Sequence, residues 1–455
     1  MVLTTARKPM GHQAVAAKWL LATRNTICNG QRLRGRILAD DMGLGKTYSA
    51  LLAAKVHKAN DAQCLVVVIA PASLLRNWET EARLAGVKID ICVSNHHSKI
   101  PSGIAGNFVV ICDEAHAFQN PDSARTKKLL ALAATPDCQG IYLLTGTPVK
   151  NGRPHNLLPL LQAINHGIVR AGKIRDYLVR FCGPRQVWTP RGYVTVFDGA
   201  THLDELHQLT KAAILRRTAD ECLDLPDLTR VLREVELTAD ENADYQAHFN
   251  RLQATYRARL REGKIKSGND KLVLLNQLRL AGSVAKARTA IDIAEEVTET
   301  GGQIVIFTCF RETAEKVAAH FGVPVFDGSA SLAARDAMVQ AFQSHTQKVF
   351  VGIDKAGGVG LTLHAHGKCR HVLLLDRPWT PGDALQLEKR AHRIGQPNSV
   401  NAVWLQHGTI DDKVDGIIQQ KAENIEHILT GERISIAFSE ENMADAVIDA
   451  LGWND

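Results

Sequence analysis

The segment from Asp40 to Thr47, DDMGLGKT, carries residue types that bind phosphate groups. Glycines such as Gly43 and Gly45 let backbone N–H groups approach a phosphate closely. Lys46 can neutralise the β- and γ-oxygens of a nucleotide, and the Thr47 hydroxyl can join a magnesium shell. The general pattern for such a loop has a glycine where this sequence has Asp40. The segment predicts a nucleoside-triphosphate site, and the aspartate in it needs an explanation.

A pair of acids ends the apolar run in the sequence FVVICDEAH. Asp113, at the carboxyl end of a predicted strand, can hold magnesium, and Glu114 beside it can activate water. Two solvated acids at a strand end are the alternative interpretation. Because this pair follows a GKT loop, we favour a site that hydrolyses a nucleoside triphosphate.

His116 stands two residues beyond the acids, without the CxxC or HxxxH partner that a zinc site would need. We therefore expect it to form a hydrogen-bonding relay with the segment LLTGTPVKN. Thr145, Gly146 and Thr147 lie in this segment and end a further predicted strand. They are suited to sense an occupied site and to couple it to movement.

The sequence QLEKRAHRIGQ contains Arg390 and Arg393, whose spacing of three places them on one face of a helix. Two guanidinium groups that point together can stabilise the charge on a γ-phosphate during transfer. Where this effect operates it contributes about 10³ to 10⁵ in rate. A solvated helix face is the alternative. The preceding glycine-rich segment KAGGVGLTLHAH favours a functional pair.

Strands must position these residues, and short apolar, β-branched runs occur in two separate regions of the chain. Runs of this kind, separated by helical patterns, are typical of parallel sheets that are buried on both faces and bind ligands at their carboxyl ends. The fold class is therefore α/β, with two parallel-sheet lobes. The runs cover residues 34–40, 64–71, 107–116 and 141–148 in the first half, and 302–310, 348–356, 371–378 and 401–408 in the second.

The region from about residue 150 to residue 290 is more polar and has a helical pattern. Pro226 marks a break near the end of the first lobe. We expect a first lobe over residues 1–232 with a helical insertion from about 150 to 232, a second lobe over 233–430 with a helical insertion from about 238 to 290, and a helical tail over 431–455.

A chain of 455 residues with 45% hydrophobic and 22% charged residues is typical of a globular protein of two or three domains. No apolar run approaches the ~18 residues that span a bilayer, so we expect no membrane partner. The nine cysteines are scattered singly, which favours a reduced intracellular compartment, cytoplasmic or nucleoid-associated. Residues 251–266 carry many basic side chains and one acid, which indicates either a surface that follows phosphates or a solvated helix face.

Several motifs occur in a fixed order, and together they resemble the Swi2/Snf2 type of superfamily 2 helicase-like motors over residues 8–425. The motifs read ILADDMGLGKT, VVVIAPASLLRNWETEA, DEAH, LLTGTPVKN, KAGGVGLTL and WTPGDALQLEKRAHRIGQ. The resemblance implies two tandem RecA-like lobes, ATP and Mg²⁺ as cofactors, and aspartate as the family's form at Asp40. Residues 213–237 resemble the compact bacterial, viral and annealing-helicase branch, so a virus-encoded origin stays open.

The resemblance also implies roles for individual residues in ATP hydrolysis. Gln13 resembles the family's adenine-reading glutamine, although an ordinary polar helix residue is the alternative. The family commonly has glutamate where Asp41 stands, a minor departure. Catalysis is assigned to Lys46, Glu114, Arg390 and Arg393, magnesium to Thr47 and Asp113, and nucleotide binding to Gln13, Asp41, Met42, Gly43, Leu44, Gly45, Lys46, Thr47, Gly360, Arg390 and Arg393.

A second implied set of residues would contact DNA. Short hydroxyl side chains and glycines suit this task, because they let phosphates be contacted without reading base identity. Binding would be independent of sequence and sensitive to salt. The residues are Ser73, Asn77, Gly328, Ser329, Gly357 and Gly358. The segment before KAGG, residues 351–354, lacks the serine or threonine that the family usually has there, which puts one polar contact in doubt.

The expected function is an ATP-dependent motor that moves along double-stranded or forked DNA, with a directing protein partner left open. We expect no strand-separating wedge or hairpin. One alternative is a strand-separating DNA or RNA helicase, for which Trp78, Trp379 and Phe310 would be candidate stacking platforms, although core packing is the simpler interpretation of such aromatics. Another is a nucleotide-controlled binding switch without translocation.

Overall fold

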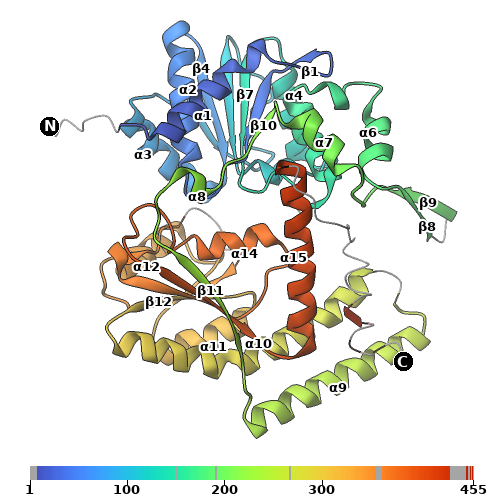
Figure 1. Ribbon diagram of the computed structural model, residues 1–455, viewed down its shortest axis with the longest axis vertical. Helices are drawn as coiled ribbons and strands as arrows, with labels where there is room; N and C mark the ends of the chain where they lie inside the picture. The colour runs from blue at the N-terminus through green and yellow to red at the C-terminus, as the bar shows by residue number, and fades with distance from the viewer. Residues whose placement is uncertain are drawn as a thin grey trace. The chain divides into compact units, whose positions relative to one another are not determined.

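A computed structural model describes residues 8–149, 152–189, 192–265, 268–354, 361–430, 447, 448, 451 and 453. The chain divides into two compact units. The first consists of Met1–Leu223 with Ala422–Ala437, and the second of Asp224–Lys421 with Phe438–Asp455. Each unit is built around a sheet of its own (Figure 1).

The first unit contains a six-stranded sheet of order β10-β3-β7-β6-β4-β5, in which every neighbouring pair is parallel. The inner strands consist almost entirely of buried apolar residues, as expected where helices cover both faces. Because β3, β7 and β6 are neighbours, the loops that follow them lie at one edge of the sheet. The strands are β3 (Gly35–Leu38), β4 (Leu65–Ala70), β5 (Ile91–Ser94), β6 (Phe108–Asp113), β7 (Cys138–Leu144) and β10 (Ile214–Leu215).

Helices of the first unit pack on this sheet and on one another. α1 packs against α2, and α2 packs against α3. The helices are α1 (Gly11–Leu21), α2 (Lys46–Asn60), α3 (Leu75–Ala85), α4 (Ala124–Ala134), α5 (Leu158–Ala163), α6 (Ile174–Phe181), α7 (Leu203–Thr210) and α8 (Ala219–Cys222). Two antiparallel hairpins complete the unit, β1 (Ile27–Cys28) with β2 (Gln31–Arg32) and β8 (Arg185–Thr189) with β9 (Gly192–Val196).

The second unit repeats the architecture with a six-stranded parallel sheet of order β11-β16-β15-β12-β14-β13. Its strands are β11 (Leu228–Glu234), β12 (Gln303–Thr308), β13 (Val325–Phe326), β14 (Val349–Ile353), β15 (Cys369–Leu374) and β16 (Val400–Gln406). Its helices are α9 (Ala239–Arg261), α10 (Gly268–Glu299), α11 (Arg311–Phe321), α12 (Leu332–Gln343), α14 (Pro381–Glu388) and the first part of α15 (Gly408–Thr430), which from Ala422 on belongs to the first unit. Apolar side chains fill both faces of this sheet.

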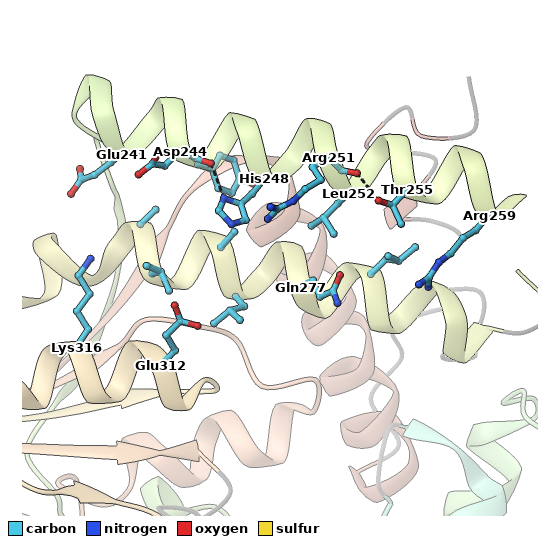
Figure 2. A pocket seen from close by; sticks show the side chains of 16 residues that line it. Glu241, Asp244, His248, Arg251, Leu252, Thr255, Arg259, Gln277, Glu312 and Lys316 are labelled. Atoms are coloured by element: carbon cyan, nitrogen blue, oxygen red, sulfur yellow. Dashed lines mark hydrogen bonds between the residues drawn. The ribbon is translucent and has the colours of Figure 1, made fainter. Parts of the chain in front are cut away.

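A pair of long helices, α9 and α10, lies beside the second sheet. α9 begins with a capping box in which Thr238 accepts from the backbone of Glu241 and the Glu241 side chain accepts in return. A cavity of about 520 Å³ opens between α9, α10 and the start of α11. Glu241 and Asp244 lie at one end of its α9 side and Arg251 and Arg259 toward the other (Figure 2). The basic stretch of the sequence covers the last turns of α9, where Arg251, Arg259 and Arg261 are exposed.

The predicted fold class, two parallel α/β sheets in tandem, is confirmed, and all eight predicted apolar runs contain strands of the two sheets. The division between the units differs from the expected boundary at 232, because it falls after Leu223. β11 belongs to the second sheet, where it pairs with β16 along its whole length. The expected helical insertion over 150–232 also contains the β8–β9 hairpin and the edge strand β10.

All nine cysteines are free thiols, as their spacing predicts. No helix in the described part of the chain is long and apolar enough to cross a membrane. Within the same residues, no group of three or more His, Cys, Asp or Glu side chains is arranged to hold a metal ion.

Candidate active site

The DDMGLGKT segment forms the loop between β3 and α2, which begins at Lys46. Gly43 and Gly45 have φ values of 89° and 72°, a region that side chains disfavour. A Cβ atom on Gly45 would lie 2.4 Å from Nε2 of Gln13. Glycine is therefore required at Gly45 both for backbone conformation and for the close approach of α1.

Lys46 is the half-buried first residue of α2, and its ammonium group donates to two loop carbonyls. The distances from Nζ are 2.7 Å to the Asp40 oxygen and 3.1 Å to the Asp41 oxygen. Burial lowers the pKa of Lys46, while the carboxylates of Glu114, Asp40 and Asp113 oppose that shift. The loop thus holds a cation among acids at the sheet edge, where a phosphate could compete for it.

Asp40 is buried and is held by Arg217, which follows β10. Nε of Arg217 donates to one carboxylate oxygen at 3.0 Å, and Nη2 donates to the other. Nη1 of Arg217 also donates to the His12 carbonyl at 2.9 Å. The φ of Asp40 is not positive, so this position does not require glycine. An aspartate can therefore stand here, and one guanidinium ties the loop to the first turn of α1.

The neighbouring pair repeats this arrangement nearer the surface. Nη1 of Arg216 lies 2.8 Å from the Asp41 carboxylate and 3.0 Å from the Ala39 carbonyl oxygen. Oδ2 of Asp41 also accepts from the backbone of Ala219 at 3.3 Å. Sequence reasoning missed both arginines. The adjacent pair in AILRRTAD was visible, but nothing local indicates which acids it meets.

Gln13 is fully buried in α1, directly beneath the loop. Its Nε2 donates to the Leu44 carbonyl at 3.4 Å, and its Oε1 accepts from the backbone of Met10 at 3.1 Å. Nε2 of His12 lies 2.9 Å from the same Leu44 oxygen. The structure therefore places the Gln13 side chain in contact with the loop, as expected for a residue of the nucleotide site.

Asp113 ends β6 and is buried. Nε1 of Trp78 donates to Oδ2 at 2.8 Å, and the backbone N–H of Glu114 donates to Oδ1 at 2.9 Å. Burial and the Glu114 carboxylate raise the pKa of Asp113 to about 6, against the hydrogen bond from Trp78. Two close carboxyl groups beside Lys46 are the oxygen-rich set that magnesium prefers.

Trp78 is completely buried. The candidate role of this residue as a stacking platform is wrong, because a ring without exposed surface cannot meet a base. Its position on α3 lets the indole reach across to Asp113. Trp78 thus orients a candidate magnesium ligand.

Glu114 has a φ of 48°, uncommon for a residue with a side chain and often found at functional sites. Its Oε2 lies 3.2 Å from Nδ1 of His116, which is 3.3 Å from the Thr145 hydroxyl. The Thr145 hydroxyl accepts from the Thr147 backbone at 3.0 Å. The relay expected between the acids and the loop after β7 is therefore present as a chain of contacts.

Gly146 lies against the phosphate loop. A Cβ atom on Gly146 would come within 3.0 Å of the Met42 side chain and within 3.8 Å of Nζ of Lys46. Gln119, which the sequence did not single out, donates to the Pro148 carbonyl at 2.8 Å and steadies the same loop. The candidate nucleotide-site residues of the first unit thus converge at the carboxyl ends of β3, β6 and β7.

In the second unit, the structure corrects the expected setting of the arginine pair. α14 ends at Glu388, so Arg390 and Arg393 lie beyond the helix rather than on one face of it. The Arg390 backbone carbonyl accepts a hydrogen bond from the Leu363 N–H at 2.8 Å. Both guanidinium groups converge nonetheless on the Leu361 carbonyl, at 3.3 Å and 2.7 Å. Burial lowers the pKa of Arg393.

The candidate DNA-contacting residues divide among three places. Ser73 and Asn77 are exposed, in the turn before α3 and in its first turn. Gly328 and Ser329 are exposed after β13, where the Ser329 hydroxyl donates to Asp327 at 2.7 Å. The remaining glycines lie outside the described residues: Gly357, Gly358 and Gly360.

The other two candidate aromatics flank one cation. The Arg279 guanidinium lies 4.5 Å from the ring centre of Trp379 and 5.7 Å from that of Phe310. Both rings are half-buried. They pack on an arginine, an arrangement that stabilises the protein itself.

Comparison with known families agrees with this geometry. Residues 12–97 and 88–282 match the SNF2-related domain, and residues 285–395 match the helicase conserved C-terminal domain. The chain belongs to the SNF2 family. The family predicted from the motifs is therefore confirmed.

Relatives of this SNF2 chain come from animals and bacteria. It is 27% identical to the mouse DNA annealing helicase and endonuclease ZRANB3, over 93% of this chain and 42% of that protein. It is also 27% identical to the putative ATP-dependent helicase/translocase YwqA of Bacillus subtilis, over 92% of this chain and 49% of that protein. Among solved structures, the Sulfolobus solfataricus SWI2/SNF2 ATPase core in complex with dsDNA is 22% identical, with a TM-score of 0.41 and coverage of 99% of this chain and 97% of that chain. The chain spans less than half the length of the curated relatives it matches.

The Arg217 contacts of this SNF2 chain lead to a first prediction. Arg217→Ala leaves the Asp40 carboxylate buried and unpaired, which costs about 3–5 kcal/mol of folding free energy. We expect a lower unfolding temperature and a KM for ATP at least about tenfold higher, because the loop and α1 lose their common anchor. Steady-state hydrolysis and thermal unfolding measure both effects.

Two variants show whether the pair itself is responsible. Arg217→Ala combined with Asp40→Gly removes the unpaired charge and should regain most of the stability. Arg180→Ala breaks the exposed pair with Glu205 and should change neither quantity measurably. An unchanged KM in Arg217→Ala would show that the arginine does not position the loop.

Asp113 supplies a prediction about pH. Its pKa rises from 3.8 to about 6 on folding, so between these values the folded protein holds a proton that the unfolded chain has released. Stability contributed by this group therefore falls as pH rises through that window, by about 3 kcal/mol in total. Asp113→Asn cannot ionise, so its unfolding temperature should increase relative to wild type between pH 4 and pH 8.

The substitution also loses one of the two hydrogen bonds to the carboxylate, at a cost of about 1 kcal/mol. That cost is the same at every pH, so the trend with pH is the diagnostic quantity. Thermal unfolding of both proteins across this range measures it. A constant difference would mean that Asp113 is already ionised at pH 4.

Proposed function

We propose that this SNF2 chain hydrolyses ATP and uses the cycle to move along double-stranded or forked DNA, without sequence specificity. The observation that carries the proposal is the convergence of Lys46, Asp113 and Glu114 at the carboxyl ends of neighbouring strands, with the half-buried Lys46 surrounded by acids. Support comes from the family and from relatives whose names include an annealing helicase that acts on DNA and a helicase/translocase.

In this proposal Lys46 holds the β- and γ-phosphates and Glu114 is the general base. Asp113 and the Thr47 hydroxyl would hold Mg²⁺, which neutralises charge developing on the phosphates. His116 and Thr145 would couple the occupied site to the loop after β7. Arg390 and Arg393 keep the catalytic role that the motifs predict, and Gln13 that of reading adenine.

The DNA contacts are proposed on the residues predicted for them. Ser73, Asn77, Gly328 and Ser329 are exposed, so their short side chains and backbone N–H groups are accessible to phosphates. Gly357 and Gly358 complete the proposed set. A protein that works on DNA in this way fits the cytoplasmic or nucleoid-associated location expected from the sequence.

Steady-state ATP hydrolysis with no nucleic acid, single-stranded DNA, plain duplex, forked duplex and RNA tests the proposal. We expect strong stimulation by duplex or forked DNA. Stimulation confined to single strands or RNA would favour the strand-separating helicase instead. Hydrolysis that ignores every nucleic acid would overturn the proposal.

A further inference from the structure

The β8–β9 hairpin is a part of the first unit that neither sheet nor candidate active site uses. Its strands form a separate antiparallel sheet with five paired positions, from Arg185 opposite Val196 to Thr189 opposite Gly192. It extends away from the main sheet of its unit (Figure 1). The sequence did not predict this hairpin.

The base of the hairpin is held firmly. Arg185 donates two hydrogen bonds to the Asp198 carboxylate, at 2.9 Å and 2.7 Å. The backbone of Gly199 donates to the Cys182 carbonyl at 2.9 Å. A Cβ atom on Gly199 would lie 3.1 Å from the Cα of Gly183, so the two entering segments touch. A projection with such a base can present side chains in a fixed orientation.

The outer part of the hairpin has exposed apolar side chains that are not packed in the protein core. The Tyr193 side chain is 74% exposed and that of Val194 is 47% exposed. By strand register, the position opposite Tyr193 is Trp188. An isolated two-stranded hairpin is only marginally stable, and the exposed Tyr193 ring does not pack in a core that could stabilise it. An exposed aromatic side chain of this kind indicates a role in binding.

The chain that leads into and forms the hairpin has an excess of basic residues, of which Lys173, Arg180 and Arg185 form ion pairs with Asp176, Glu205 and Asp198. Residues 170–191 contain six Lys or Arg residues and a single acid, Asp176. Arg170 and Arg175 are exposed, and Arg170 and Lys173 line an open hollow of about 560 Å³ with Gln31 and Asn165. Exposed aromatic side chains and exposed cations are the two features that bind single-stranded nucleic acid, with stacking for the bases and cations for the phosphates.

We propose that the β8–β9 hairpin binds the unpaired nucleotides of a DNA fork, with Tyr193 stacked on a base and the Arg170 and Arg175 side chains on the phosphates. The inference rests on the proposed function, because it assumes that DNA is the track. The positive charge favours nucleic acid over a protein partner as the occupant of this surface.

The test compares Tyr193→Ala and Tyr193→Phe with wild type, using full-length chains. Fluorescence anisotropy measures binding to a forked duplex and to a plain duplex of the same length, in the absence of nucleotide. Tyr193→Ala should weaken fork binding between about fivefold and about a hundredfold and leave plain-duplex binding unchanged. Tyr193→Phe retains the ring and should bind like wild type.

A fluorescent base analogue in the first unpaired position of the fork gives an independent measurement. Wild type and Tyr193→Phe should quench it by stacking, and Tyr193→Ala should not. Equal fork binding by Tyr193→Ala and wild type would overturn the proposal and leave the hairpin to a protein partner. An equal loss on forked and plain duplex would also overturn it, because a paired base is not available to stack.

The cations are tested separately with Arg170→Glu combined with Arg175→Glu, which should weaken fork binding most at low salt. Unchanged fork binding by this variant would show that Arg170 and Arg175 do not contribute to the proposed DNA-binding surface. The controls keep the two proposals distinct. If hydrolysis by wild type ignores all nucleic acids, the proposed function fails, whereas a normal duplex response with an unaffected Tyr193→Ala variant defeats the hairpin proposal alone.

Discussion

Glu114→Gln should reduce ATP hydrolysis by about 10²- to 10⁴-fold, the contribution of a positioned general base, while ATP still binds. The amide keeps the size of the side chain but cannot accept a proton from water. Rapid-quench and steady-state assays measure the loss, and equilibrium binding of a fluorescent ATP analogue measures what remains. Under the proposed function, the Glu114→Gln variant should bind DNA and fail to move along it.

The same substitution has a second consequence at the neighbouring acid. The Glu114 carboxylate helps raise the pKa of Asp113, so removing its charge should lower that pKa below about 6. Glu79→Gln, at an exposed position of α3, is the matched control and should leave hydrolysis unchanged. Full hydrolysis by Glu114→Gln would require a different base.

Lys46→Ala should lower hydrolysis by at least about 10²- to 10³-fold, because it removes a preorganised cation from the developing charge on the phosphates. Affinity for ATP should fall as well, while affinity for duplex DNA should stay close to that of wild type, since the Lys46 ammonium group points into the loop and donates to the Asp40 and Asp41 carbonyls. Hydrolysis, nucleotide binding and DNA anisotropy separate these effects.

Lys55→Ala is a suitable control for that experiment. Lys55 lies on the same helix, α2, and its ammonium group bonds the Ala85 carbonyl at 3.1 Å, away from the loop. This variant should hydrolyse ATP at the wild-type rate. A comparable loss in both variants would mean that damage to α2, and not the missing cation, explains the result.

Local sequence was sufficient for the parts of this protein that depend on neighbours along the chain. The phosphate-binding loop could be predicted from its glycines, because a backbone with positive φ that closely approaches other atoms accepts few other residue types. The central strands could be predicted because a strand buried on both faces must be apolar throughout. Asp113 and Glu114 followed, since they directly end such a strand.

Other features depend on residues far apart in the sequence, and no local pattern reports them. Arg217 meets Asp40 across 177 positions, and Trp78 reaches Asp113 only because α3 packs beside β6. Arg390, just beyond the end of α14, likewise accepts a hydrogen bond from the distant Leu363 N–H.

By itself, the sequence determined the family and the two parallel sheets, and it predicted the acids and the cation of the candidate nucleotide site, because each is encoded by a contiguous motif with its own periodicity or backbone requirement. Only the tertiary structure decided that β11 belongs to the second sheet and that the β8–β9 hairpin stands apart with Tyr193 exposed. Strand pairing and burial are set by contacts between segments distant in sequence. The local sequence of these residues is therefore also compatible with a loop or a helix.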